Sequence, residues 1–431
     1  MLLGIDDFKN INIKRGRGYG NYILKIVTEI MEEVVDLSLS IYRVDGDRYA
    51  INMEGRTKGM VQTTYLLIQE KVLPYCTMSA GAVPYGEEIL DGSTDVGGGV
   101  IDVVAKTSDD NGATWGEEKT LVKGNGPNKP FDIAHGDAAV VCDRKTGEML
   151  MMCASGNVWY WRSTLENPNR VGRYYSKDGK NWTGSEITSD IYKLMNGAVN
   201  KLFFSSGRIC QSSKIKAGSH YRIYSALCTN IGNVVLYSDN FGRTWLPLGG
   251  ADARPTLDGD EAKVVELPNG SVLLSSRSQK GNGRIFNIYT YTNAKKAEGK
   301  WDKPVYLDNK TYPSARCNGE VLLVKARRMS DGKRTHVLLY SVPMSGKREN
   351  VGIYYKELAS ADDYSSPECF KSGWKVYRVS NTDSAYSTME QMANGNIAFF
   401  YEESEQNGGY DMVFDSYTLA IITNGEFQHL K

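Results

Sequence analysis

The side chains in this sequence that are best suited to chemistry are carboxyl groups, one tyrosine and two arginines in separated segments. They are Asp91, Asp95, Asp102, Glu261, Arg277, Arg348, Tyr386 and Glu402. Carboxyl groups transfer protons, a tyrosine becomes a nucleophile once a base takes its proton, and the planar fork of an arginine donates two parallel bonds to a carboxylate. A fold that gathers these segments could therefore support acid–base and nucleophilic chemistry beside a bound carboxylate.

A turn-like unit repeats between these segments. The pattern S-x-D-x-G-x-x-W is complete at Ser108–Trp115, one residue shorter at Ser176–Trp182, and has Asn240 at the Asp position in Ser238–Trp245. Gly299–Trp301 reads as a worn fourth copy, and the four Trp residues are 67, 63 and 56 positions apart. In such a turn the Asp accepts backbone N–H bonds, the Gly permits a positive φ and the Trp packs between strands. The spacing suits four-stranded blades, so we expect these turns to have a structural role.

The elements that must position the chemistry fall into two unlike segments. Residues 1–88 read as α/β, with expected strands over 1–5 and 75–83, helices over 22–35 and 61–72, and a hairpin around an Asp45-Gly46 turn within 40–52. From residue 89 to 431 short strand-like runs alternate with Gly, Asn and Asp, which predicts a mainly β domain.

The composition agrees with a β-rich protein. The 431 residues include 27 Tyr and 44 Gly but only 12 Pro, which suits many short strands and tight turns. The formal net charge is zero, which argues against a nucleic-acid partner because phosphates select a basic surface.

No targeting or metal-binding pattern stands out. No apolar run approaches the roughly 18 residues that span a bilayer, so we expect no membrane partner. Asp6 and Asp7 stand where a secretory signal would be basic, which favours a cytoplasmic location. The seven cysteines are scattered without a C-x-x-C pair, so we expect neither a disulfide framework nor a zinc site, and we predict no cofactor.

The repeated turns resemble the Asp-boxes of bacterial sialidases (neuraminidases), and the resemblance extends over residues 91–431. It implies a six-bladed β-propeller with an incomplete first blade and retaining exo-α-sialidase activity, the removal of terminal sialic acid from glycans or glycoproteins. Family members are often secreted or held at the cell surface. Their nucleophile is a tyrosine. A neutral nucleophile suits this substrate because the carboxylate of sialic acid would repel an anionic one.

The resemblance assigns a role to each chemical residue. Ser384-Ala-Tyr-Ser-Thr-Met resembles the family strand A-Y-S-x-[LM], which makes Tyr386 the nucleophile. Glu261 would be its base, with Glu266 as the alternative, and Arg277 would bind the substrate carboxylate. Arg348 lies in Lys347-Arg-Glu-Asn-Val, which resembles the R-x-N segment of another carboxylate-binding arginine.

The general acid and the first of the arginines that bind the substrate carboxylate (the carboxylate clamp) need separate comment. Asp95, in a glycine-rich loop, matches the family acid best, Asp91 is the alternative, and Asp102 is expected to be structural. Glu402 would hold the first clamp arginine, but the Arg-Ile-Pro segment that carries it is missing. A second arginine is missing close before Asp95, and residues 72–83 are the only stretch left to supply inner strands of the first blade. Each lost charge-assisted bond costs about 1.5–3 kcal/mol, so the resemblance implies impaired activity.

Residues 1–88 resemble a diguanylate cyclase (GGDEF) domain. The resemblance is carried by Gly4–Asn12, Tyr42–Tyr49 and Cys76–Tyr85. The family signature Gly-Gly-Asp-Glu-Phe reads Asp-Gly-Asp-Arg-Tyr here, so Arg48 replaces an acidic residue of the metal–nucleotide centre. A cation repels Mg²⁺, so the resemblance implies a partial, degenerate and inactive domain.

Two other functions remain open from the sequence. The missing arginines favour a propeller that binds sialosides or other carbohydrates without turnover, whereas Asp95, Glu261 and Tyr386 favour the enzyme. The other is nucleotide signalling through residues 1–88, but the altered GGDEF signature counts against it.

Overall fold

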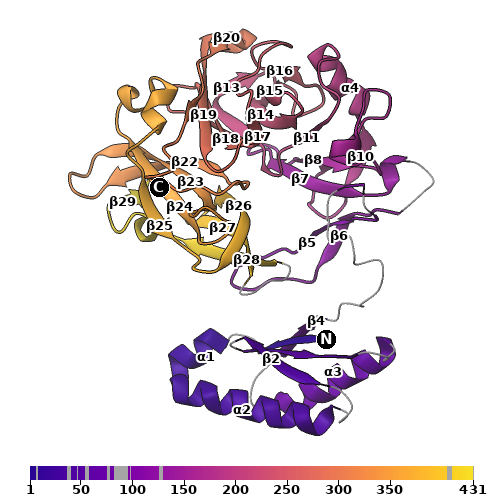
Figure 1. Cartoon of the computed structure of the whole chain (residues 1–431). Coiled ribbons are helices and arrows are strands. Elements are labelled where there is room, and N and C mark those ends of the chain that lie inside the picture. Colours follow the sequence, from indigo (N-terminus) through magenta and orange to yellow (C-terminus); the bar gives the residue numbers. More distant parts are fainter. Residues whose placement is uncertain are drawn as a thin grey trace. The chain divides into compact units, whose positions relative to one another are not determined.

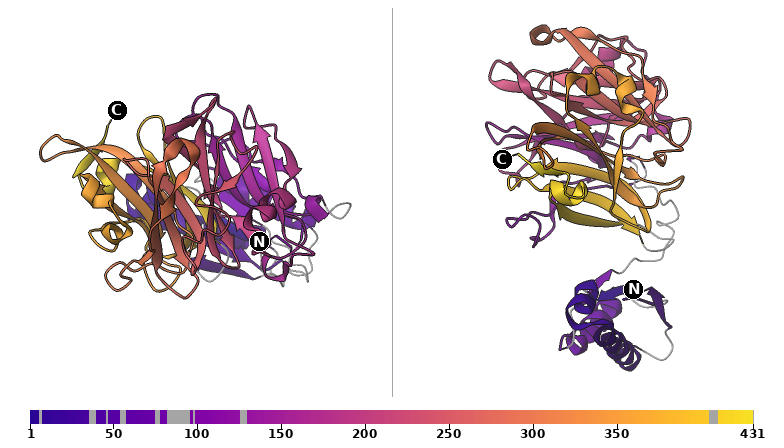
Figure 2. Two further views of the ribbon diagram at one scale, coloured as in Figure 1. Left: turned by 90° about the horizontal axis from the view of Figure 1, so that it is seen from above. Right: turned by 90° about the vertical axis from the view of Figure 1, so that its left-hand side faces the viewer.

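The computed structural model describes residues 1–5, 8–35, 40–45, 47–53, 58–74, 78–81, 96–97, 99–125, 130–404 and 410–430. The chain forms two compact units, Met1–Gly92 and Ser93–Lys431. The expected boundary between residues 88 and 89 lies outside the described residues. Figures 1 and 2 show the two units.

The first unit is an antiparallel sheet covered by helices (Figure 1). The strand order is β2-β3-β1-β4. The elements are β1 (Leu2–Ile5), α1 (Phe8–Arg15), α2 (Arg17–Val34), β2 (Ile41–Asp45), β3 (Arg48–Ile51), α3 (Lys58–Val72) and β4 (Met78–Gly81). Ile23, Val27 and Met31 of α2 are fully buried because they recur every four residues and face the sheet.

Two details of this unit differ from the sequence prediction. In the hairpin Asp45 pairs with Arg48, so Asp45 belongs to strand β2 and not to the turn that the sequence had predicted. The difference follows from a register irregularity between Arg43 and Asp45. The described residues of the stretch 72–83 belong to the first unit and supply no strand to the second, because Val72 ends α3 and Met78–Gly81 pairs with β1.

The second unit is almost entirely β. Its strands are β5 (Val103–Ala105), β6 (Lys119–Val122), β7 (His135–Cys142), β8 (Met149–Ser155), β9 (Arg170–Ser176), β10 (Thr183–Glu186), β11 (Leu202–Phe204), β12 (Gly207–Arg208), β13 (Cys210–Ala217), β14 (His220–Thr229), β15 (Gly232–Ser238), β16 (Leu246–Pro247), β17 (Gly259–Glu266), β18 (Val272–Ser278), β19 (Arg284–Asn293), β20 (Glu298–Trp301), β21 (Val305–Tyr306), β22 (Val321–Arg328), β23 (Arg334–Pro343), β24 (Val351–Leu358), β25 (Lys375–Arg378), β26 (Asp383–Gln391), β27 (Ile397–Ser404), β28 (Asp411–Tyr417) and β29 (Phe427–His429). Its α-helices are short: α4 (Thr188–Tyr192) and α5 (Leu419–Ile422).

These strands form six sheets in the described part of the unit. Five have the orders β10-β9-β8-β7-β12, β11-β14-β15-β16 with β13 on β14, β17-β18-β19-β20 with β21 on β19, β25-β24-β23-β22-β29, and β26-β27-β28. The sixth is the pair β5-β6. The sheets follow one another around a common centre, toward which β7, β17, β22 and β26 lie (Figure 1).

Each large hydrophobic core is shared by two consecutive sheets. Leu150 and Met152 of β8 pack with Leu227 of β14, for example, and Phe286 of β19 packs with Leu338 of β23. Two further cores join β14 to β18 and β23 to β27. Because both faces of an inner sheet are covered in this way, strands such as β18 are buried along almost their whole length.

The three repeated turns have one geometry. The Ser hydroxyl accepts the Gly N–H at 2.7, 2.9 and 2.8 Å in the pairs Ser108–Gly112, Ser176–Gly179 and Ser238–Gly242. All three glycines have positive φ, as expected. The Asp or Asn side chain accepts a backbone N–H at 2.8 Å in the pairs Asp110–Thr114, Asp178–Asn181 and Asn240–Thr244. The hydrogen-bonding role predicted for these turns is therefore confirmed.

The tryptophans of the repeat differ from one another. Trp245 is buried between sheets as predicted, but Trp115 is 45% exposed and its ring rests edge-on against Phe414 at 4.9 Å. Gly299–Trp301 lies within strand β20, so the proposed fourth copy is not a turn of this kind.

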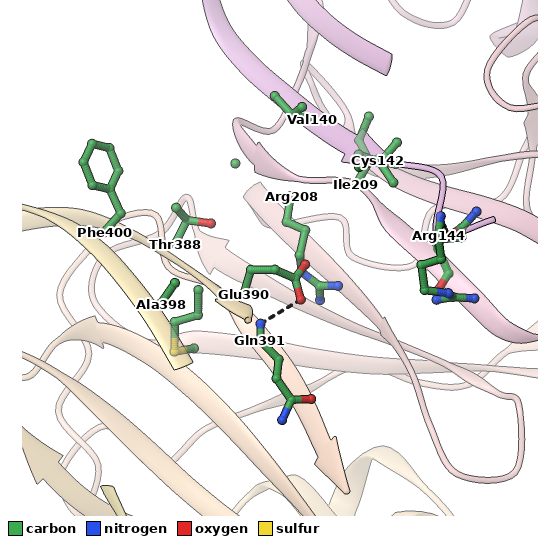
Figure 3. Close-up of a pocket in the computed structure, with 14 residues that line it drawn as sticks. Val140, Cys142, Arg144, Arg208, Ile209, Thr388, Glu390, Gln391, Ala398 and Phe400 are labelled. Carbon is green, nitrogen blue, oxygen red and sulfur yellow. Dashed lines mark hydrogen bonds and ion pairs between the residues drawn. The ribbon is translucent and has the colours of Figure 1, made fainter. Parts of the chain in front are cut away.

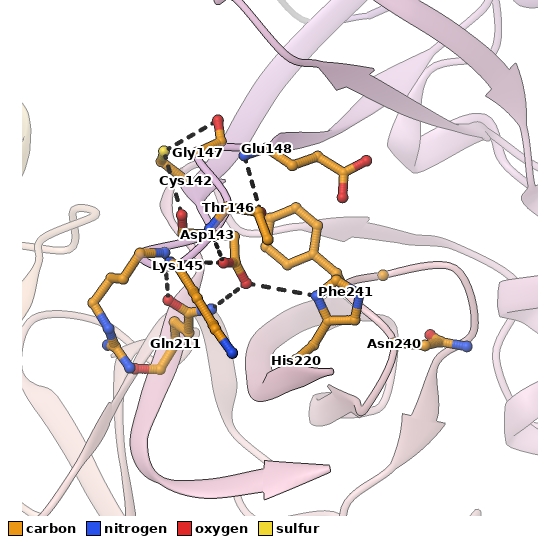
Figure 4. A network of polar contacts seen from close by, with 12 residues as sticks. Cys142, Asp143, Lys145, Thr146, Gly147, Glu148, Gln211, His220, Asn240 and Phe241 are labelled. Carbon is orange, nitrogen blue, oxygen red and sulfur yellow. Dashed lines mark hydrogen bonds and ion pairs between the residues drawn. The ribbon is translucent and has the colours of Figure 1, made fainter. Parts of the chain in front are cut away.

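A buried carboxylate connects two neighbouring sheets (Figure 4). Asp143, directly after β7, is 2% exposed and accepts the N–H groups of Lys145 and Thr146 at 2.8 Å each. Its other oxygen accepts Nε2 of Gln211 on β13 at 2.9 Å and lies 3.6 Å from Nδ1 of His220 on β14. The turn after β7 is thereby fixed to the next sheet.

Three observations concern possible ligands and partners of the described residues. No described helix is long and apolar enough to cross a membrane. In the part of the chain that the structure describes, no group of three or more His, Cys, Asp or Glu side chains could hold a metal ion. The six described cysteines are free thiols.

Candidate active site

Three of the predicted residues meet near the centre of the second unit. Nη1 of Arg277, on β18, donates to Oε2 of Glu261 on β17 at 2.5 Å and to the hydroxyl oxygen of Tyr386 on β26 at 3.3 Å. Glu261 and Tyr386 are 125 residues apart and belong to different sheets. The fold thus brings together a phenol, a carboxylate and a guanidinium.

Local backbone geometry explains how Glu261 and Tyr386 point to the same place. The register of β17 against β18 shifts between Gly259 and Ala262, and the register of β26 against β27 shifts between Ser384 and Ser387. Each shift is a β-bulge, in which an extra residue turns a side chain away from the regular alternation. Glu261 and Tyr386 both lie inside these bulges.

Burial and charge define the state of the tyrosine. Burial raises the pKa of Tyr386 well above its ordinary value, the charge of Glu261 raises it further, and Arg277 lowers it. Tyr386 is therefore neutral at neutral pH and can lose its proton only to a nearby base. Glu261, 3% exposed, is the carboxylate placed to accept it.

The other two predicted residues contact Tyr386 from different sides. The guanidinium carbon of Arg348, an exposed residue, lies 5.3 Å from the centre of the Tyr386 ring. Oε2 of Glu402 accepts the backbone N–H of Tyr386 at 3.0 Å, which helps to hold the bulge of β26. The expectation that Glu402 binds a clamp arginine stays a prediction.

The alternatives raised from the sequence lie elsewhere. Glu266 accepts hydrogen bonds from Ser212 and from the N–H and hydroxyl of Ser213, the last two at 2.7 Å each, so it joins β17 to β13. Oδ1 of Asp102 accepts the N–H of Gly124 at 2.8 Å, as a structural residue would. Asp91 and Asp95 lie outside the described residues, so the general acid has no described position.

The structure adds one candidate that the sequence analysis did not single out. Asp137, on β7, lies in a third bulge, between Gly136 and Ala139, and has φ +51°. A non-glycine residue in the left-handed region costs about 1–2 kcal/mol and is often found at functional sites. The only sequence signal was its position after a glycine at the start of an inner strand.

Comparisons with known proteins show the family of each unit. The BNR repeat-like domain family matches residues 91–399, and the chain belongs to it. Residues 1–81 match the diguanylate cyclase, GGDEF domain, so the first unit is a fragment of that domain. A sialidase of Micromonospora viridifaciens is 26% identical over 322 residues, which are 70% of this chain and 44% of that protein. The chain therefore spans less than half the length of this relative.

Solved structures show the same fold. An intramolecular trans-sialidase from Ruminococcus gnavus, in complex with oseltamivir carboxylate, is 14% identical with a TM-score of 0.57 over 74% of this chain and 88% of that one. The NanB sialidase of Streptococcus pneumoniae is 13% identical with a TM-score of 0.57, and the match covers 87% of this chain and 74% of that one. A leech intramolecular trans-sialidase in complex with 2,7-anhydro-Neu5Ac is 14% identical with a TM-score of 0.58, and the match covers 88% of this chain and 74% of that one. The protein is thus a distant sialidase homologue with a sialidase-like fold.

Proposed function

We propose that the second unit is an exo-α-sialidase that removes terminal sialic acid from glycans or glycoproteins with retention of configuration. The observation that carries this proposal is the meeting of Tyr386, Glu261 and Arg277 within 3.3 Å contacts from two different sheets. A buried, neutral tyrosine beside a carboxylate is the arrangement that a nucleophile for an anionic sugar requires.

The scaffold that we propose is a six-bladed propeller with an incomplete first blade. In two of the full sheets the repeated turn joins the third strand to the fourth: β9 to β10 and β15 to β16. The turn at Ser108–Trp115 likewise joins β5 to β6, so this pair corresponds to the outer half of a blade. The described residues supply no inner half.

The proposed reaction has two displacements. The Tyr386 oxygen attacks the anomeric carbon while its proton passes to Glu261, and the bond to the leaving oxygen breaks as Asp95 protonates that oxygen. Water, deprotonated by Asp95, then attacks the same carbon, and the phenol oxygen leaves with the proton returned by Glu261. Two inversions give retention. Arg277 and Arg348 would bind the substrate carboxylate.

Turnover of a fluorogenic aryl sialoside by the whole chain tests the proposal. Wild type should release the fluorophore and Tyr386→Phe should be at least about a hundredfold slower, because it lacks the nucleophile but keeps the ring beneath Arg348. Proton NMR of the first product should show the anomer with retained configuration. Equal rates for the two proteins would refute the role of Tyr386.

Binding without turnover is the second candidate function. It is favoured by the 2.5 Å contact that occupies both Arg277 and Glu261, and by the lack of the first clamp arginine. Calorimetric binding of a sialoside with no product release, in wild type and in Tyr386→Phe alike, would support this function over the enzyme.

A further inference from the structure

The pair β5-β6 occupies the place of a whole sheet in the second unit. Trp115, in the turn between the two strands, contacts Phe414 on β28, and Val122 on β6 packs with Met151 on β8. The pair therefore lies between the sheet of β26 to β28 and the sheet of β7 to β10 (Figure 1). In the latter sheet, β7 and β8 form a hairpin on the central side of β9 and β10. Among the described strands, β5 pairs with β6 alone.

A cavity of about 530 Å³ lies between the same two neighbouring sheets (Figure 3). Its lining includes Val140 and Cys142 of β7, Thr388 of β26, and Ala398 and Phe400 of β27. No residue of β5 or β6 lines it. Because β7 and β26 are the inner strands of the two flanking sheets, the cavity lies where inner strands of the first sheet would run.

The walls of this cavity are sheet faces that are open to solvent. Val140 is 37% exposed and Phe400 is 39% exposed. Their direct neighbours Val141 and Phe399 point to the opposite faces and are buried in cores shared with other sheets. One face of each flanking sheet is therefore packed, whereas apolar side chains on the face toward the cavity meet water. Such paired apolar surfaces are typical of a binding site.

A carboxylate continues one of these faces toward the candidate active site. Ala398, Phe400 and Glu402 alternate along β27, so all three project to one side of the strand. Glu402 lies about 7 Å along the strand from Phe400. It is half-buried, its Oε2 accepts the N–H of Tyr386, and no cation among the described residues forms an ion pair with it. An arginine on a strand between the two sheets would supply that cation.

We propose that the cavity binds a β-hairpin of another polypeptide, which completes the first sheet and brings an arginine to Glu402. The edge of β5 that faces away from β6 offers backbone groups to an added strand, which is a common way of binding a peptide. Apolar side chains on the two faces of the hairpin would cover Val140 and Phe400. Only the effect on activity rests on the proposed function, in which this arginine would help to bind the substrate carboxylate.

The experiment uses a synthetic hairpin with an Asn-Gly turn and two strands of seven residues, the length of β8 and β18. Its strands consist of Val, Ala and Thr, with one arginine at the end opposite the turn. A second hairpin has glutamine in place of that arginine. Cys142, an exposed free thiol in the cavity lining, reports occupancy through its rate of alkylation by a maleimide, measured by mass spectrometry. Cys369, outside the lining, is the reference thiol.

Both hairpins should slow the alkylation of Cys142 by at least about tenfold at saturation and leave Cys369 unchanged. Phe400→Asp should weaken calorimetric binding by at least about tenfold, because it places a charge on an apolar wall. Val376→Asp is the matched control, at an equally exposed strand position outside the lining, and should bind like wild type. On an aryl sialoside, the arginine hairpin should raise kcat/KM by about tenfold or more over the glutamine hairpin, and Glu402→Gln should remove this difference.

Unchanged alkylation of Cys142 with both hairpins would overturn the proposal, as would wild-type affinity in Phe400→Asp and in a second wall variant, Val140→Asp. Sedimentation of the chain alone tests another occupant: a dimer that Phe400→Asp dissociates would show that a second copy of this chain fills the cavity instead. Equal turnover with the two hairpins would refute the role of the arginine. If no sialoside is turned over under any condition, the proposed function fails, but the alkylation and calorimetry still decide whether the hairpin binds.

Discussion

Replacement of Glu261 by glutamine separates the chemical role of this residue from its structural role. Glutamine keeps the shape of the side chain but cannot accept the Tyr386 proton. Loss of a general base slows a reaction by about 10²–10⁴-fold, which is about 3–5 kcal/mol of barrier. The variant also removes the charge that Arg277 contacts at 2.5 Å. Breaking a buried ion pair costs about 3–5 kcal/mol, but Asp260 remains 3.6 Å from Nε of Arg277, so we expect a loss of about 1–3 kcal/mol in unfolding free energy.

The same strand provides a matched control. Glu266 is also buried on β17, and it binds Ser212 and Ser213 rather than the candidate site. Glu266→Gln should lose a similar amount of stability while keeping kcat within about threefold of wild type, because it removes no proton acceptor from the reaction. Stopped assays on an aryl sialoside give kcat and KM, and urea unfolding gives stability. If both variants lost activity in proportion to stability, Glu261 would have no special chemical role.

Three further predictions concern the scaffold. For Asp143, burial raises the pKa, but bonds from Thr146, Lys145 and Gln211 outweigh it and hold the pKa below its ordinary value of 3.8. The contribution of Asp143 to stability is therefore present above about pH 4 and is lost as the pH falls further. Asp143→Asn should remove that pH dependence and should lower the unfolding free energy at pH 7, measured by urea unfolding, by about 1–3 kcal/mol. Gly242→Ala should lower the unfolding free energy by more than Gly218→Ala does. Both glycines have positive φ, but only at Gly242 would a β-carbon clash with the buried Leu150. Gly218→Ala should cost about 1 kcal/mol, and equal losses in the two variants would contradict this prediction. Asp110, whose pKa is lowered to about 2 by bonds from the Thr114 hydroxyl and N–H, should tolerate Asn within about 2 °C of thermal midpoint, because Asn240 makes the equivalent 2.8 Å bond in the third turn.

The sequence was informative where a local pattern determines local geometry. The repeated turns could be predicted because Ser, Asp and Gly make their bonds within five residues of one another. The α2 helix followed from apolar spacing, whereas α1 has little amphipathic character and no helix was expected there. Asp45 was assigned to the hairpin turn and not to β2, because a register irregularity in β2 leaves no mark in the sequence.

The site could be predicted only in part for a related reason. Tyr386, Glu261 and Arg277 were found from the segments around them, but the β-bulges that aim two of them depend on long-range strand register. Asp137 was missed because its strained backbone is visible only in three dimensions.

The edge-on contact of Trp115 with Phe414 joins two residues that are 299 positions apart in the chain. On one side of it is the two-stranded pair β5-β6, and on the other the sheet β26-β27-β28. Other consecutive sheets share apolar cores, but the contact between these two sheets includes a tryptophan that is almost half exposed to water. We therefore expect thermal opening of the second unit to start at the contact between these two sheets, before the other sheets separate.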